Sequence, residues 1–148
     1  CSMKGKRVNA GTFKVNRAAA WPHHDLEYYC RDLNSWPQSW MGEEKDIPPG
    51  EKLVACFRPF LQALADSSLS PKAIQKHVDN VWALGGEIIR NLNDNPSLRR
   101  KSIEEILDDR IDEEGGPLVY ALESEELQQR SLDSTCRKLY LFLRQQPR

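Results

Sequence analysis

Long hydrophobic runs are missing from this sequence of 148 residues, and none approaches the roughly 18 apolar residues that a membrane-spanning helix needs. The basic N-terminal residues are not followed by an apolar segment, which argues against a secretory signal peptide. Cys1 and Ser2 before Met3 are typical of a cloning remnant. With 39% hydrophobic and 29% charged residues, the composition indicates a single cytoplasmic domain that does not enter a membrane.

Cysteines and catalytic motifs are also sparse. Beyond the first residue the thiols are Cys30, Cys56 and Cys136, an odd number with no close spacing, which is typical of reduced thiols in the cytosol. His23 and His24 lack the paired spacing that a zinc site requires, so we expect no metal and no other cofactor. No phosphate-binding loop, nucleophile elbow, zinc-protease or dinucleotide-binding motif is present. The sequence therefore predicts a protein that is not an enzyme.

A strong net charge is absent as well, because the formal net charge is −1 at pH 7. The charges are nevertheless distributed unevenly. Residues 3–24 contain five basic residues and no acidic one, whereas residues 104–126 contain ten acidic residues and Arg110 as their sole base. Residues 1–20 are typical of an extended basic arm, although residues 12–15 also fit a short strand. Such asymmetry indicates either a polyanion-binding face or ordinary solvated helix surfaces.

The longest regular pattern predicts a helix over residues 70–93. Ser70 suits the N-cap and Pro71 suits the first helical position, where its missing N–H costs nothing. Trp82 is expected to widen the apolar face of this helix, whose main positions are Ile74, Val78, Val81, Gly85, Ile88 and Leu92. An interior glycine costs roughly 1 kcal/mol relative to alanine. Gly85 therefore indicates either a close approach by another helix or, with the glycine after it, a bend.

The remaining patterns predict an all-α fold. The other expected helices span about 25–34, 51–66, 102–112 and 124–146. We expect Trp36 before Pro37 to end the first of them and residues 47–50 to form a linker or turn. Pro59 is expected to kink the helix over 51–66, and Ser102 with Glu105 forms a capping box for the helix over 102–112. The result is a four- to five-helix bundle over residues 21–148, with a tryptophan-rich helical segment at its start.

Residues 51–146 resemble the N-terminal core-binding domain of tyrosine recombinases and phage integrases. The resemblance rests on "SSLSPKAIQKHVDNVWALGGEII", which matches the turn and "LSPKTI"-like start of a long second helix, and on "QRSLDSTCRKLYLFL" in the last helix. It implies a four-helix SAM-like fold. The catalytic domain of that family has no counterpart here, and Tyr140 lies within a helical stripe. The resemblance therefore implies a non-catalytic DNA-binding or adaptor protein of the kind found with mobile elements.

Double-stranded DNA is the partner that this resemblance favours. The exposed side of the central helix would read bases. The basic residues Arg99, Arg100 and Lys101 after it would hold phosphates, and the arm would reach around the duplex. The expected DNA-binding residues are Lys72, Gln75, Lys76, Asn80, Arg99, Arg100, Lys101, Lys4, Lys6 and Arg7. His77, at the edge of the apolar stripe, is expected to be a core histidine.

The alternative function is a protein–protein interaction or homodimerisation module without nucleic-acid contact. The tryptophan cluster is expected mainly to fold back over the core, yet it also suits a partner site. The end of the last helix is apolar almost all round, which is typical of a helix that is buried on several sides or bound by a partner. The expected partner-binding residues are Trp21, Trp36, Trp40, Leu141 and Phe142.

Overall fold

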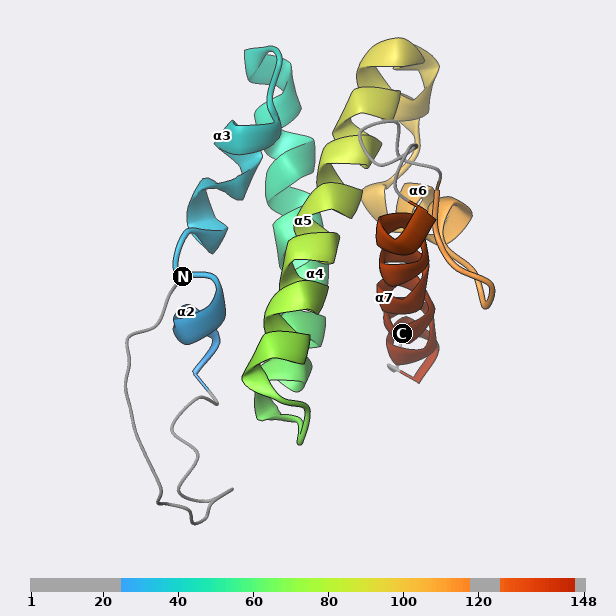
Figure 1. The fold of residues 1–148 in the computed structure, drawn as a ribbon. Helices are drawn as coiled ribbons and strands as arrows, with labels where there is room; N and C mark the ends of the chain where they lie inside the picture. Colours follow the sequence, from blue (N-terminus) through green and yellow to red (C-terminus); the bar gives the residue numbers. More distant parts are fainter. Residues whose placement is uncertain (1–24, 118–125, 146–148) are drawn as a thin grey trace.

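The computed structural model describes residues 25–117 and 126–145, and these residues form an α-helical bundle without strands (Figure 1). The predicted all-α fold is confirmed. The basic arm, residues 12–15, Trp21 and the Ser124 cap lie outside the described residues. The elements are α2 (Leu26–Tyr29), η1 (Leu33–Ser35), α3 (Trp36–Trp40), η2 (Glu44–Asp46), α4 (Ile47–Asp66), α5 (Pro71–Asp94), η3 (Pro96–Arg100), α6 (Ile103–Arg110) and α7 (Glu126–Gln145).

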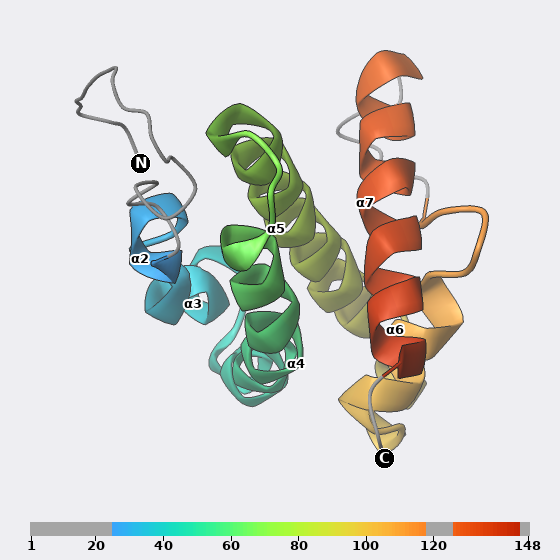
Figure 2. The same ribbon diagram turned by 90° about the horizontal axis from the view of Figure 1, so that it is seen from below.

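Helix α5 is the element that all the other α-helices contact. It begins as predicted, because the Ser70 hydroxyl accepts a hydrogen bond from the Ala73 N–H at 3.1 Å and Pro71 occupies the first turn. Its 24 residues correspond to a length of about 36 Å at 1.5 Å per residue. Seen from below, α2 and α3 lie on one side of α5 and α7 lies on the other (Figure 2). Helix α5 is therefore the central helix of the bundle, with α2 and α3 packed on one side and α7 on the other.

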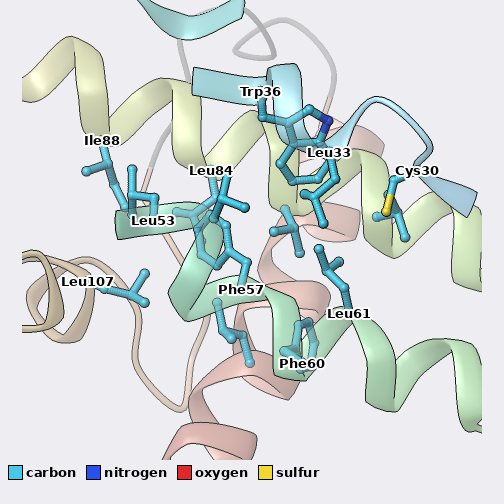
Figure 3. Packing of buried hydrophobic residues seen from close by; sticks show 14 of the residues in the cluster. Cys30, Leu33, Trp36, Leu53, Phe57, Phe60, Leu61, Leu84, Ile88 and Leu107 are labelled. Atoms are coloured by element: carbon cyan, nitrogen blue, oxygen red, sulfur yellow. The ribbon is translucent and has the colours of Figure 1, made fainter. Parts of the chain in front are cut away.

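The core fills the space between α4 and α5 and continues to the other helices. Phe57 and Leu61 of α4, Leu84 and Ile88 of α5, and Leu132 of α7 are each at most 1% exposed. Figure 3 shows side chains from α4, α5, α6 and the N-terminal segment converging in one cluster. Burial of a large aliphatic or aromatic side chain contributes about 1.5–3 kcal/mol. This cluster is therefore the main source of stability in the bundle.

The N-terminal segment is more broken than the sequence predicts. Instead of one helix over 25–34, α2 ends at Tyr29, a turn follows, and η1 begins at Leu33. Trp36 does not end a helix but begins α3, with Pro37 in the first turn. A proline lacks only an N–H that is unpaired at a helix start, so the same residue suits a beginning as well as an end. The prediction chose the wrong role for this proline.

The same ambiguity affects the start of α4. Residues 47–50 are not a linker, because α4 begins at Ile47 and includes Pro48 and Pro49 in its first turn. The helix also continues through Pro59, which lies on the exposed side. At the other predicted start the sequence is right: Ser102 and Glu105 form the reciprocal capping box of α6.

Gly85 marks a close approach by another helix, which is one of the two explanations that the sequence offers. Helix α5 continues through Gly85 without interruption. The group that approaches is the indole ring of Trp40 in α3. A Cβ atom at Gly85 would lie 2.9 Å from Cε2 of that ring and nearer still to two other ring carbons. At Gly86 the nearest ring atom, Cδ1, would be 3.2 Å away. Trp40 also donates a hydrogen bond from Nε1 to the Trp82 carbonyl at 3.0 Å, which fixes the ring on α5.

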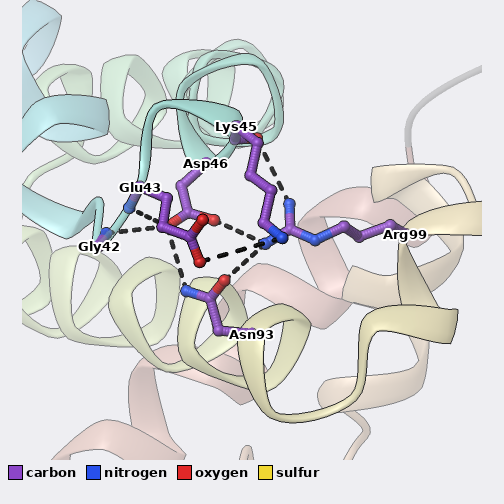
Figure 4. A network of polar contacts seen from close by, with 6 residues as sticks. All are labelled: Gly42, Glu43, Lys45, Asp46, Asn93 and Arg99. Atoms are coloured by element: carbon purple, nitrogen blue, oxygen red, sulfur yellow. Dashed lines mark hydrogen bonds and ion pairs between the residues drawn. The ribbon is translucent and has the colours of Figure 1, made fainter.

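A buried carboxylate joins the start of α4 to the end of α5. Asp46 is 0% exposed and accepts hydrogen bonds from the backbone N–H groups of Gly42 and Glu43 at 2.8 and 3.0 Å. Asn93 Nδ2 donates to it at 3.1 Å and Arg99 forms an ion pair with it at 2.7 Å (Figure 4). Burial would raise the pKa of Asp46, but these four donors outweigh it and hold the pKa well below its usual range.

The contact between Gly85 and Trp40 predicts that Gly85→Ala is destabilising although alanine favours helices. We expect the free energy of unfolding to fall by about 1–3 kcal/mol, because the ring must move away from the added methyl group. Gly86→Ala is the matched control, since its methyl group meets a looser contact and gains about 1 kcal/mol of helix propensity. Urea denaturation measures both. Equal effects of the two substitutions would contradict the close packing described here.

The Asp46 network predicts that Asp46→Ala costs roughly 2–4 kcal/mol, between the values for exposed and fully buried ion pairs. Because the folded-state pKa is lowered, this contribution is complete above about pH 4 and is lost as the pH falls further. The wild type and the variant should therefore converge in stability in acid. Lys101→Gln removes the exposed pair with Asp109 and should cost less than about 1 kcal/mol. A constant difference between wild type and Asp46→Ala at all pH values would refute this explanation.

Candidate functional site

A groove of about 1060 Å³ runs along the N-terminal half of α5. Helix α5 forms its floor, the segment from α2 to α3 forms one wall, and the first turns of α7 form the other. The two walls lie on opposite sides of α5 in Figure 2. We call this feature the α5 groove. Its volume is at the upper end of the range found for small-molecule pockets and it is open along its length, so it suits an extended occupant.

Two large apolar side chains line the α5 groove and remain exposed. Trp82 of α5 is 43% exposed and Leu127 of α7 is 75% exposed. The Trp82 indole is held in place, because its Nε1–H donates to the Ser39 hydroxyl at 2.9 Å. Trp36, only 3% exposed, forms part of the wall behind it. The groove therefore presents an oriented aromatic ring and an exposed aliphatic side chain.

The charges along the α5 groove differ in whether they are already paired. Arg31, Lys72 and Lys76 line it and have no hydrogen bond or ion pair among the described residues. The two acidic groups in the lining are both engaged: Asp79 accepts from Gln75 at 3.1 Å, and Asp32 accepts from Trp36 Nε1 at 3.3 Å. Three cations and two carboxylates give the lining a formal net charge of +1, and the charges without a partner among the described residues are the three cations.

A polar network next to the groove joins α5 to α7. His77 Nδ1 lies 2.6 Å from the Thr135 hydroxyl oxygen, and Asn80 donates to the same oxygen at 2.9 Å. Asn80 also donates to the side-chain hydroxyl and the carbonyl of Ser131. His77 is 4% exposed; burial, then Lys138 and Lys76, lower its pKa to about 4. The expected core histidine is thus neutral near pH 7 and helps to dock α7.

The predicted DNA-binding residues do not form one surface. Lys72 and Lys76 are exposed on α5, but Gln75 is hydrogen-bonded to Asp79 and Asn80 is used in the contact with α7. An amide that already holds two helices together is a poor reader of base edges. The arm residues Lys4, Lys6 and Arg7 lie outside the described residues. Of the predicted DNA-binding residues on α5, Lys72 and Lys76 therefore remain available for contact with a duplex.

The basic residues that follow α5, Arg99, Arg100 and Lys101, are far from those two lysines. The 22 residue steps from Lys72 to the end of α5 at Asp94 correspond to about 33 Å of helix. Arg99 is bound to Asp46, and Lys101 pairs with Asp109 at 3.2 Å. Arg100 is exposed and has no partner among the described residues. The basic residues therefore fall into two groups at opposite ends of α5.

The predicted partner-binding residues are mostly used inside the fold. Trp36 is buried and Trp40 packs against Gly85, which confirms for these two tryptophans that they fold back over the core. Phe142 packs against Phe60, with ring centroids 5.5 Å apart. Leu141 is 55% exposed and remains available. Trp36 cannot offer a free surface, because almost none of its side chain reaches solvent.

Sequence reasoning named several residues that line the α5 groove but missed its two exposed apolar side chains, Trp82 and Leu127. Trp82 was expected on the apolar face, but it lies at the edge of that face and 43% of it stays exposed. The available signal was its position beside Asp79 and Ala83, outside the main stripe. Leu127, in the first turn of α7, precedes the buried stripe that begins at Leu132 and was not singled out. Their juxtaposition depends on how α7 packs against α5, which periodicity does not specify.

Other kinds of site find little support in the described residues. Within residues 25–117 and 126–145, no three His, Cys, Asp or Glu side chains are placed to hold a metal ion. Burial is the first cause that raises the pKa of each described thiol, to about 12 for Cys30 and Cys136 and about 11 for Cys56. These thiols are protonated near pH 7 and are poor nucleophiles. The helices described here are all too short or too polar to cross a membrane.

Comparison of the chain with protein-family models, with curated proteins and with solved structures finds no match. The resemblance to recombinase core-binding domains therefore remains a prediction. The helix order from α4 to α7 is the order that this resemblance implies, but helix order alone does not identify a family.

The buried position of His77 predicts a pH-dependent stability. Because its folded-state pKa is lowered to about 4, stability is complete above about pH 6.5, the ordinary value for histidine, and falls as the pH drops toward 4. The loss should reach at most about 3 kcal/mol. His77→Gln should flatten the slope of unfolding free energy between pH 6.5 and 4, whereas the double substitution His23→Gln with His24→Gln should preserve it. An unchanged slope in His77→Gln would show that His77 is not the group responsible.

Proposed function

We propose that this protein is a non-enzymatic protein-binding module whose α5 groove receives an amphipathic segment of a partner protein, with apolar and acidic side chains. The observation that supports the proposal most directly is that Trp82 and Leu127 line the same groove and are 43% and 75% exposed. Large apolar side chains that stay in solvent within one groove are typical of an interaction site.

The apolar part of the segment would cover Trp82 and Leu127. Tryptophan is among the residues that contribute most to binding energy at protein interfaces. The hydrogen bond from Trp82 to Ser39 already fixes the ring, so little side-chain entropy is lost when a partner covers it. Burial of the remaining exposed apolar surface contributes at about 25 cal/mol per Å². The groove is therefore partly pre-organised for an apolar occupant.

The acidic part of the segment follows from the unpaired cations. Arg31 stands on one wall, and Lys72 and Lys76 stand on α5, all without a partner among the described residues. Asp32 and Asp79 also line the groove, so the three cations leave it with a formal net charge of +1. Complementary charge raises the association rate and selects the partner more than it adds affinity. An acidic partner segment is the occupant that this charge pattern favours.

DNA binding remains the competing prediction, and the geometry supports it less. It would rely on Lys72 and Lys76 near the groove, since Asn80 is engaged with α7 and Arg99 with Asp46. The apolar group that a duplex presents in its grooves is the methyl of thymine, which would cover little of Trp82 and Leu127. A phosphate-binding face also gains from a continuous row of cations, and here the two basic groups stand about 33 Å apart along α5.

Peptide display against the folded chain tests the proposal. Selected peptides should combine apolar with acidic residues. Their affinity, measured by fluorescence anisotropy, should fall at least tenfold for Leu127→Ser with Trp82→Ala, since each loss of about 1.4 kcal/mol is a factor of ten. Lys72→Glu with Lys76→Glu should weaken acidic peptides and leave their neutral analogues bound. Leu141→Ser, an exposed leucine outside the groove, is the matched control and should change nothing.

Two outcomes would overturn the proposal. Selected peptides that bind the Trp82 and Leu127 variant as tightly as the wild type would show that the groove is not the docking site. Duplex DNA that binds with a log-affinity slope of about −0.9 per phosphate against log salt, and is lost in Lys72→Glu with Lys76→Glu, would favour the DNA-binding function instead. Circular dichroism of each variant distinguishes lost binding from lost folding, and Leu127→Ser alone provides a milder test.

A further inference from the structure

A second pocket, of about 360 Å³, lies at the far end of α5 from the groove. It is enclosed by the first turns of α4, the end of α5, η3 and the start of α6. All four charged residues in its lining are cations: Lys45, Lys52, Arg99 and Lys101. The rest of the lining is apolar except for one hydroxyl, with Pro48, Pro49, Leu92, Ile103, Ile106 and Ser102. A cationic rim over an apolar floor differs in chemistry from the α5 groove.

Arg99 is held firmly at this pocket. Its guanidinium is bound to Asp46 at 2.7 Å and to the Asn93 side-chain oxygen at 2.7 Å (Figure 4). The Arg99 side chain is 22% exposed, and its Nε–H is buried with no hydrogen-bond partner in the described part of the chain. The contact of Arg99 with the Lys45 carbonyl is long, at 3.4 Å. Arg99 is therefore positioned by Asp46. Its remaining donor capacity lies at Nη1, because Nη2 donates to Asp46 and Asn93 and Nε is buried.

The three lysines are more loosely bound. Lys52 has no hydrogen bond or ion pair among the described residues. Lys45 lies 3.9 Å from Glu43 and Lys101 lies 3.2 Å from Asp109, and in both pairs each side chain is about half exposed or more. Exposed ion pairs of this kind contribute little, so an incoming anion displaces them at small cost. The lysines can turn toward a ligand while Arg99 stays in place.

The start of α6 adds only a weak contribution. The positive end of a helix dipole favours an anion, and Ser102 and Ile103 line the pocket. The Ser102 hydroxyl and backbone N–H are already used in the capping box with Glu105. The attraction for an anion therefore comes from the four cationic side chains and not from unpaired groups of the helix end.

We propose that this pocket binds a small phosphorylated molecule, with its phosphate group at Arg99, Lys52 and Lys101 and an apolar part against Leu92 and Ile106. Arginine and lysine are the side chains that bind phosphate oxygens best, and Arg99 supplies a fixed geometry that lysines alone do not. The volume is near the lower limit of small-molecule sites and too small for a folded partner. The site is independent of the α5 groove, so either assignment can fail alone.

Binding of phenyl phosphate to the full chain, followed by NMR titration at constant ionic strength, tests this proposal. Phenyl phosphate should bind more tightly than inorganic phosphate because it also covers the floor, and neutral benzyl alcohol should bind much more weakly. Lys52→Gln with Lys101→Gln removes two rim cations and should weaken phenyl phosphate by at least about tenfold, since one charged hydrogen bond contributes that much or more. Lys72→Gln with Lys76→Gln, the same change of charge in the α5 groove, should leave its affinity unchanged.

Three results would overturn this assignment. The first is the absence of saturable shifts with phenyl phosphate. The second is equal weakening by the two double substitutions, which would indicate a general effect of net charge. The third is a duplex DNA that loses affinity in Lys52→Gln with Lys101→Gln while phenyl phosphate does not bind, which would make the pocket part of a nucleic-acid surface. Arg99 is left unchanged in these variants because its loss would disturb the buried Asp46 network.

Discussion

Burial of helix α5 between two layers of helices is the constraint on which the structure depends. Its apolar stripe packs against α4, and its flanks are covered by α3 on one side and by α7 on the other. Each of these two helices is attached to α5 by a specific contact. Trp40 lies directly on Gly85, and the network of His77, Asn80 and Thr135 attaches α7. The covers leave the N-terminal part of α5 open between them, and that opening is the α5 groove.

The two ends of α5 consequently have different chemistry. At the N-terminal half, Trp82 and Leu127 stay exposed beside unpaired cations. At the C-terminal end, Asp46 collects four donors and holds Arg99 in a fixed position, and the nearby lysines complete a cationic pocket. A buried carboxylate here serves two purposes, since it ties the start of α4 to the end of α5 and fixes the guanidinium of Arg99. This arrangement supports two separate binding proposals, one for an apolar and acidic segment and one for a small phosphorylated molecule.

The sequence predicts what is local and misses what is not. The starts of α5 and α6 are correct, because Ser70 with Pro71 and Ser102 with Glu105 act within one turn. Pro37 and Pro48 are misread, because a proline fits a helix start as well as the end of the preceding one. The ion pair between Asp46 and Arg99 joins residues 53 positions apart, and the exposure of Trp82 depends on the packing of α3 and α7. Neither the ion pair nor this exposure produces a periodic pattern in the sequence. The predicted DNA-binding and partner-binding residues therefore include some whose side chains are already engaged in contacts within the fold.

The central claim is that the α5 groove is the docking surface for a partner protein. The most direct measurement is a two-dimensional NMR titration with a peptide selected by display, which follows the indole N–H of Trp82 and the methyl groups of Leu127 and Leu141. The claim predicts large, saturable shifts for Trp82 and Leu127, with Leu141 unchanged. Shifts centred on Leu141 or around Arg100, with Trp82 unaffected, would contradict it.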